Sequence, residues 1–339
     1  MFLRSLRTAL KSPHKLAMRR LMLDARSFLR LHFLDAAART GLAAALCAPS
    51  TREELAGKLG ATRPELLDAL LDVGLSLGEL ALDRGRYRVR GRALRAVQAE
   101  DGDGLAAMAE AFVTYYNSIY ANLPGRLAGG PSGDYLERIG PVVARFSRLV
   151  EPYVAGFVAA AARGWPGLRV LDAGCGSGIY LRTVAEANPG AVGLGLDRDP
   201  AVAEQARANL EHWGLGDRFA AAVGDVLDPG LDPGPGFGLL LFANLAYYFP
   251  PGEREAGYGR LARLLAPGGR LALVCTFAGR GRDLFAANLD LATRSMQGCW
   301  PLPDLAETRA QLSRAGLPVQ QVERLMPGST LYGILASPR

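Results

Sequence analysis

The sequence has little of the residues that build metal centres and disulfide frameworks. It holds three histidines and four cysteines in 339 residues, and no two cysteines stand in a CxxC pair. Zinc sites and disulfide-rich folds need such residues in clusters at short spacings. We therefore expect no metal site, a reducing compartment and a cytoplasmic location.

Long hydrophobic runs are also missing. The one run of 18 or more residues without a charged side chain, 233–252, contains four prolines and four glycines and is not the continuous apolar helix that a membrane span requires. The first 20 residues carry a charge every three or four positions and lack the apolar core of a secretory signal. Glycine and proline together number 62 (41 and 21), below the roughly 25–30% of disordered chains. The sequence predicts a folded globular protein.

Lysine is scarce, and the basic charge is unevenly placed. The net charge is +6, but residues 1–30 alone contain eight basic side chains against the single acid Asp24. Residues 15–33 have apolar side chains at helical spacing, which predicts a basic amphipathic helix. Such a helix could lie on an anionic membrane. We favour packing on a partner subunit or on the body of the chain.

Residues 50–95 have the pattern of a winged helix-turn-helix. Two short helices are expected at 51–59 and 64–73, followed by a hairpin about Asp83-Arg84-Gly85. The second helix is acidic and carries no Asn, Gln or Lys, the residues that pair with base edges. We expect residues 1–100 to form a dimerisation domain that binds no specific nucleic acid.

Residues 101–163 are predicted to be a helical linker that contributes to a substrate pocket. An aromatic stripe recurs there at helical spacing, at Phe112, Tyr115, Tyr116 and Tyr120. Most such stripes are core, but amphipathic rings beside Asn117 also suit the wall of a pocket for an aromatic guest. Tyr116 is the candidate that we assign to the reaction centre.

Residues 164–339 alternate short apolar runs with helical stretches, which is typical of βαβ units and a parallel sheet. The predicted strands are 169–173, 191–196, 218–223, 238–243 and 270–276, with two antiparallel strands within 317–325 and 329–338. The predicted fold class is therefore α/β, a Rossmann-like seven-stranded domain preceded by an α-helical winged-helix domain.

The first strand of this region runs into Asp172-Ala-Gly-Cys-Gly-Ser-Gly178. The motif is GxGxG and not the GxGxxG of dinucleotide-binding folds, because Ile179 stands where the last glycine would be. No GxxxxGK[ST] loop occurs either. Asp197 ends the second strand, and Asp225 follows the third. Carboxylates there suit the ribose and the adenine amine of an unphosphorylated adenosine in the crevice at the strand ends.

With these motifs the chain resembles the class I S-adenosylmethionine-dependent methyltransferases over 169–338, through VLDAGCGSG, LGLDRD, GDV and LLAPGGRLAL. Together with the preceding winged helix it resembles the small-molecule O-methyltransferases, in which that module dimerises the subunits. The resemblance implies S-adenosylmethionine as cofactor and a small acceptor of the kind made in secondary metabolism. It implies these cofactor-binding residues: Asp172, Gly174, Gly176, Gly178, Asp197, Asp225, Val226 and Asn244.

The roles carried over by position are specific. Asp172 and the three glycines would cradle the methionine part of the cofactor, Asp197 the ribose, and Asp225 with Val226 the adenine. Asn244 would lie near the reacting methyl group.

The chain departs from this family where many relatives that methylate phenols carry a histidine base, three residues after the position of Asn244. Tyr247 stands there, and no histidine matches the place. Tyrosine, with a reference pKa of about 10, is a poor base at neutral pH, so we expect Tyr247 to orient the acceptor. The predicted catalytic residues are Tyr247, Asn244 and Tyr116. O-methylation is favoured over N- or C-methylation.

Two alternatives use the same fold. The enzyme could use S-adenosylmethionine to assist a cyclisation or elimination without methylation, which the missing histidine motivates. Alternatively, the chain could be a cofactor-sensing regulator that binds DNA through its winged helix, which the acidic second helix disfavours.

Overall fold

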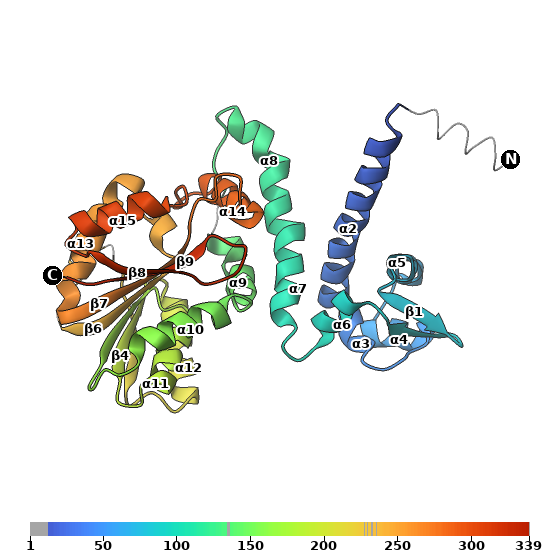
Figure 1. Ribbon diagram of the computed structural model, residues 1–339. Coiled ribbons are helices and arrows are strands. Elements are labelled where there is room, and N and C mark those ends of the chain that lie inside the picture. Colours follow the sequence, from blue (N-terminus) through green and yellow to red (C-terminus); the bar gives the residue numbers. More distant parts are fainter. Residues whose placement is uncertain are drawn as a thin grey trace. The chain divides into compact units, whose positions relative to one another are not determined.

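The computed structural model describes residues 13–338 except 134, 135, 227, 229, 232 and 235, and only the backbone of 136–139 and 141. The chain divides into two compact units, and the residues of each unit mostly contact one another (Figure 1). The first unit comprises Met1–Pro124 with Leu136–Leu149, and the second comprises Gly125–Tyr135 with Val150–Arg339. The three domains predicted with boundaries at 100 and 163 stay a prediction.

The first unit contains a small antiparallel hairpin among helices. Thr51 begins a helix with a reciprocal capping box, in which its side chain accepts from the amide of Glu54 and the Glu54 carboxylate accepts from its amide. The hairpin turns at Arg84 and Gly85, both with positive φ (49° and 75°). The winged-helix interpretation is compatible with this order. The elements are α2 (Lys15–Arg39), α3 (Leu42–Ala45), α4 (Arg52–Leu59), α5 (Pro64–Leu77), β1 (Leu80–Asp83), β2 (Arg86–Val89), α6 (Arg92–Gln98), α7 (Asp103–Glu110), a π-helix (Ala111–Tyr116), α8 (Asn117–Leu127) and α9 (Leu136–Ser147).

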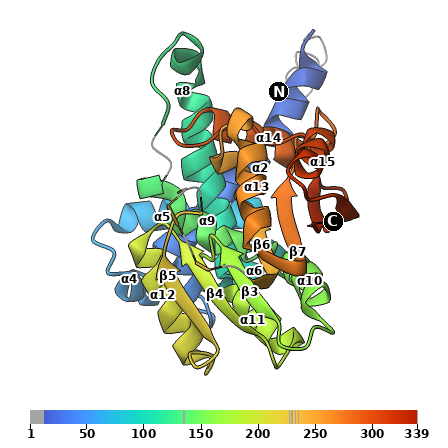
Figure 2. The same cartoon turned by 90° about the vertical axis from the view of Figure 1, so that its left-hand side faces the viewer.

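The second unit is built on a seven-stranded sheet with the order β5-β4-β3-β6-β7-β9-β8. The first five strands in this order are parallel, while β9 pairs antiparallel with both β7 and β8, as the sequence predicts. Figure 2 shows β5, β4, β3, β6 and β7 side by side. The strands are β3 (Arg169–Ala173), β4 (Val192–Asp197), β5 (Phe219–Val223), β6 (Phe237–Ala243), β7 (Leu265–Thr276), β8 (Val319–Arg324) and β9 (Leu331–Ala336).

Helices cover both faces of this sheet, which explains why its central strands are mostly apolar. Neighbouring strand residues alternate between two hydrophobic clusters: Val170 faces the cluster of α10, α11 and α12, and Leu171 faces that of α13 and α15. These two groups of helices lie below and above the sheet in Figure 1. Their bounds are α10 (Glu151–Ala162), α11 (Ile179–Ala187), α12 (Pro200–His212), α13 (Arg254–Leu264) and α15 (Leu305–Arg314).

The predicted elements differ from the observed ones mainly at their ends. β7 begins at Leu265 and not at residue 270, because Leu265 already pairs with Phe237 before the register shifts. The helix predicted over 15–33 continues to Arg39 as α2. Both extensions run through residues that hydrophobic periodicity alone does not mark.

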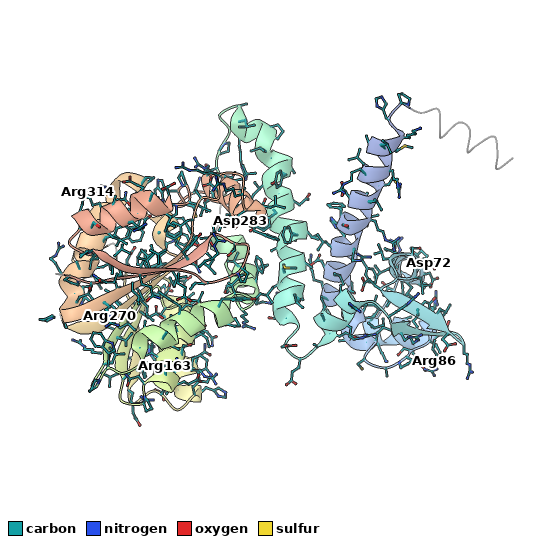
Figure 3. All side chains as sticks on the ribbon, viewed as in Figure 1. Asp72, Arg86, Arg163, Arg270, Asp283 and Arg314 are labelled. Atoms are coloured by element: carbon teal, nitrogen blue, oxygen red, sulfur yellow. The ribbon has the colours of Figure 1, made fainter. Side chains whose placement is uncertain are left out.

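The loop after β7 is tied to the start of β9 by one carboxylate. Asp283, labelled in Figure 3, begins helix α14 (Leu284–Arg294) and accepts from the amide of Ala286 at 3.1 Å. It also accepts from the amide of Thr330 at 2.7 Å. Over the described part of the chain, no helix combines the length and the hydropathy needed to cross a bilayer.

Candidate functional site

The glycine loop after β3 has a backbone that other residues would strain. Gly174 and Gly176 have φ angles of 69° and 53°, and Gly178, at 79°, begins α11. At Gly174 a Cβ would lie 2.7 Å from the side chain of Leu245, so close packing requires glycine there. At Gly176 a Cβ would meet nothing within 4 Å. The loop therefore packs on one side and leaves open space on the other.

Asp197, at the end of β4, holds this loop in place. Its half-buried carboxylate accepts from the amide of Gly176 at 3.1 Å and, through the other oxygen, from the amide of Asp199 at 3.1 Å. The amide of Cys175 also donates to the carbonyl of Leu196 at 2.9 Å. Each carboxylate oxygen keeps a second lone pair, so Asp197 can accept further hydrogen bonds from a pair of hydroxyls.

Asp172 is the most unusual group of the site. It lies near the end of β3 and is fully buried, and neither carboxylate oxygen has a donor among the described residues. Burial, with the negative charge of Asp197 second, raises the pKa of Asp172 to about 8. A buried carboxylate without donors is costly, and a cation placed beside it would remove that cost.

Asp225 and Val226 complete the edge beyond β5. The amide of Gly224 donates to the carbonyl of Asp197 at 2.9 Å, which joins this corner to the end of β4. Asp225 and Val226 are both half-buried, and Val226 packs against the hydrophobic cluster of α13 and α15. The predicted cofactor residues therefore converge on one edge of the second unit, at the carboxyl ends of β3, β4 and β5.

Asn244 and Tyr247 follow β6 at the same edge of the sheet. Asn244 has a φ of 56°, a conformation in which asparagine is enriched among non-glycine residues, and its amide donates to the carbonyl of Val274 at 2.7 Å. Tyr247 lies in a 3-10 turn, Ala246–Tyr248, with its ring centroid 4.9 Å from that of Tyr248. Leu245, between them, is the residue that packs on Gly174.

Tyr116, the third predicted catalytic residue, lies in the first unit, at the end of the π-helix. Its ring lies 4.8 Å from that of Tyr115 and 5.2 Å from that of Phe112. Burial raises the pKa of Tyr116 to about 12. The phenol therefore stays protonated at neutral pH, and its assignment to the reaction centre stays a prediction.

Arg254 is a polar residue of this region that the sequence analysis does not single out. It is the first residue of α13, is 5% exposed, and donates to backbone carbonyls on either side of Tyr247. In the sequence it stands in a run of charged residues that is typical of an exposed helix start. A basic residue against the positive end of a helix is the one signal that marks it as unusual.

Comparison with known proteins agrees with this geometry. Residues 170–269 match the family described as methyltransferase domain. The nocamycin O-methyltransferase of Saccharothrix syringae is 33% identical over 149 residues, which are 44% of this chain. The match spans 48% of that relative, or about half its length.

The fold of the whole chain recurs in solved structures. The mitomycin 7-O-methyltransferase MmcR superposes with a TM-score of 0.80 at 20% identity, covering 98% of this chain and all of that one (100%). An O-methyltransferase from neocarzinostatin biosynthesis, solved with S-adenosylmethionine and 2-hydroxy-5-methyl naphthoic acid, gives 0.69 at 21% identity, covering 92% and 96%.

These findings define the class. The chain carries a class I S-adenosylmethionine-dependent methyltransferase domain, preceded by a helical N-terminal region. Its fold is that of the small-molecule O-methyltransferases over nearly the whole length.

Proposed function

We propose that this protein transfers a methyl group from S-adenosylmethionine to a small, natural-product-like acceptor, at oxygen in the first instance. The observation that carries the proposal is the convergence of Asp172, Gly176 and Asp197 at one edge of the sheet, with Gly176 hydrogen-bonded to Asp197. The names of the nocamycin and mitomycin O-methyltransferases support the acceptor class.

The residues at this edge fit the cofactor group by group. When bound, S-adenosylmethionine supplies an activated methyl group. Asp172 would face the ammonium of the methionine part, because its buried oxygens have no donor among the described residues. Asp197 would accept from both ribose hydroxyls, Asp225 from the adenine amine, and the amide of Val226 would donate to the adenine ring.

The acceptor side has no histidine at the position of Tyr247. His212 ends α12, and His14 and His32 belong to the first unit. Tyr247 and Asn244 would therefore hold the acceptor by hydrogen bonds and would not take its proton. This arrangement suits acceptors that react as carboxylates or as already ionised hydroxyls.

Calorimetry with S-adenosylhomocysteine tests the cofactor assignment, and incubation with S-adenosylmethionine and a panel of hydroxyaromatic and carboxylic acids tests the reaction. We expect binding, and release of S-adenosylhomocysteine together with a methylated product. Conversion of an acceptor that requires S-adenosylmethionine but releases no S-adenosylhomocysteine would instead support assisted cyclisation or elimination. No heat and no thermal shift with S-adenosylhomocysteine would overturn the proposal.

Replacing Tyr247 with phenylalanine is expected to slow methyl transfer about tenfold and to leave the affinity for S-adenosylhomocysteine unchanged. The ring that packs on Tyr248 is retained, while one hydrogen bond of about 1.4 kcal/mol to the acceptor is lost. Steady-state kinetics and calorimetry measure the two effects. Tyr332→Phe, the same change on β9, serves as the control. Unchanged turnover in the Tyr247 variant would show that Tyr247 only lines the site.

We also propose that the N-terminal region joins two copies of the chain. Helix α2 exposes large apolar side chains along its length, and exposed apolar patches commonly mark interaction surfaces. Sedimentation equilibrium at twice the chain mass of 36.0 kDa would support this arrangement, and a single-chain mass would contradict it. The exposed residues are Leu16, Met18, Leu21, Met22, Leu23, Phe28 and Leu29.

A further inference from the structure

The turn that carries Tyr247 is fixed at both ends. Ala246 and Phe249 are buried in the hydrophobic cluster of α13 and α15, and the Phe249 ring meets Phe242 edge-on at 5.3 Å. Tyr247 and Tyr248, between them, are only half-buried. The two ends of the turn are therefore anchored in the core, while the two tyrosines between them remain partly accessible to solvent.

Arg254 joins this turn to a second segment. Its Nε donates to the carbonyl of Ala246 at 3.0 Å and to that of Phe249 at 3.3 Å, and its Nη2 donates to the carbonyl of Pro301 at 2.6 Å. The guanidinium thus bridges the two ends of the turn and residue 301, which is 52 positions further along the chain than Phe249. Two nitrogens of the planar guanidinium serve the two segments, with Nε shared between the carbonyls of the turn and Nη2 directed to Pro301.

The second segment returns a bond to the turn. The amide of Trp300 donates to the carbonyl of Tyr247 at 2.8 Å. The next amide but one, that of Leu302, donates to Asp290 on α14 at 2.8 Å. Residues 300–302 are therefore fixed from three directions, by Tyr247, by Arg254 and by Asp290.

Arg254 is also buried, and the hydrogen bonds that its guanidinium donates go to carbonyl oxygens. Burying a guanidinium is costly unless its donors are used. Burial accordingly lowers the pKa of Arg254 from the usual value for arginine. Two of the three carbonyls that the guanidinium binds lie at the ends of the turn. The position of Arg254 therefore depends on the geometry of the turn.

We propose that Arg254 is a positioning residue for methyl transfer, which holds the Tyr247 turn against residues 300–301 and so sets where the acceptor is held. This inference rests on the proposed function, because Tyr247 is the group through which Arg254 acts. Loosening the turn changes the distance and angle between acceptor and methyl group, to which the rate is sensitive. It leaves the ends of β3, β4 and β5 untouched.

The test compares Arg254→Lys with the parent protein. Lysine keeps the charge but carries all its donors on one nitrogen, so it lacks the fork whose Nε and Nη2 serve the two segments. We expect kcat to fall at least about tenfold while the Kd for S-adenosylhomocysteine stays within about twofold. Hydrogen exchange, read by mass spectrometry on peptides spanning 246–249 and 298–303, should quicken there and stay unchanged in β3 and β6. Arg263→Lys, at an exposed site on the same helix, is the matched control. It should change neither kcat nor hydrogen exchange.

The outcomes separate this inference from the proposed function. Unchanged exchange and unchanged kcat in Arg254→Lys would overturn the positioning role. Faster exchange across the whole second unit, with kcat falling only as the folded fraction falls, would also overturn it, because Arg254 would then be merely structural. The exchange comparison needs no acceptor. A parent protein that binds S-adenosylhomocysteine but transfers no methyl group would refute the proposed function and still leave the link between the two segments measured.

Discussion

Replacing Asp197 with alanine is expected to weaken binding of S-adenosylhomocysteine by about 3 kcal/mol, or roughly a hundredfold in Kd. The carboxylate would accept hydrogen bonds from the two ribose hydroxyls. Hydrogen bonds to a charged group are stronger than those between neutral groups. It also accepts from the amide of Gly176, so its loss frees the glycine loop as well. Isothermal calorimetry measures the change directly.

Asp199→Asn is the matched control for this experiment. Asp199 lies two residues away, is exposed, and caps α12 by accepting from the amide of Ala201 at 2.8 Å. Asparagine caps helices about as well as aspartate, so the substitution removes a nearby charge and little else. We expect less than a threefold change in Kd. Equal affinities of Asp197→Ala and the parent protein would refute the ribose assignment.

Replacing Asp172 with asparagine is expected to flatten the dependence of stability on pH. Burial, with Asp197 second, raises the pKa of Asp172 from 3.8 to about 8 in the folded protein. Between these values the folded state holds a proton that the unfolded state has released. The contribution of Asp172 to the free energy of unfolding is therefore greatest below about pH 4 and is lost as the pH rises toward 8, by about 1.4 kcal/mol per unit. Urea unfolding at pH 5, 6, 7 and 8 should show this slope in the parent protein and not in the variant.

The same substitution is expected to weaken binding of S-adenosylhomocysteine about a hundredfold, because the ligand's ammonium group loses its charged partner. In the parent protein at pH 7, binding should release nearly one proton, since a cation beside Asp172 favours its ionised form. Calorimetry in buffers of different ionisation enthalpy counts this proton. It should vanish above about pH 9 and in the variant.

Two results would contradict this account of Asp172. The first is proton release that persists in Asp172→Asn, which would assign the titration to another group. The second is a stability slope equal in the parent and the variant. Asp199→Asn again serves as the control, because it removes a nearby exposed carboxylate and leaves Asp172 in place. If Asp172→Asn is more stable than the parent protein at pH 8 but binds S-adenosylhomocysteine more weakly, Asp172 serves ligand binding at the expense of stability.

Much of the second unit could be predicted because its physical signals are local. Buried parallel strands are continuous apolar runs, and the carboxyl ends of such strands meet at one edge. The sequence alone therefore predicts that acids at the ends of separate strands, such as Asp197 and Asp225, lie close together. The glycines could be predicted because close backbone approach excludes a side chain, as Leu245 shows at Gly174.

The remainder depends on contacts between segments distant in sequence. Arg254 binds carbonyls at 246, 249 and 301, and no local pattern announces that a charged residue at a helix start is buried. The early start of β7 depends on pairing with Phe237. Among the described residues no donor reaches Asp172, and this too depends on its neighbours in space, which the sequence around position 172 does not reveal.

The rim of the cofactor site is held together by its main chain. The amide of Cys175 donates to the carbonyl of Leu196, and that of Gly224 to the carbonyl of Asp197, both at 2.9 Å, so main-chain bonds join neighbouring strand ends in addition to the Asp197 carboxylate. An engineer who wishes to alter the proposed cofactor site can therefore vary the exposed side chain at 198 while the backbone beneath it keeps its outline.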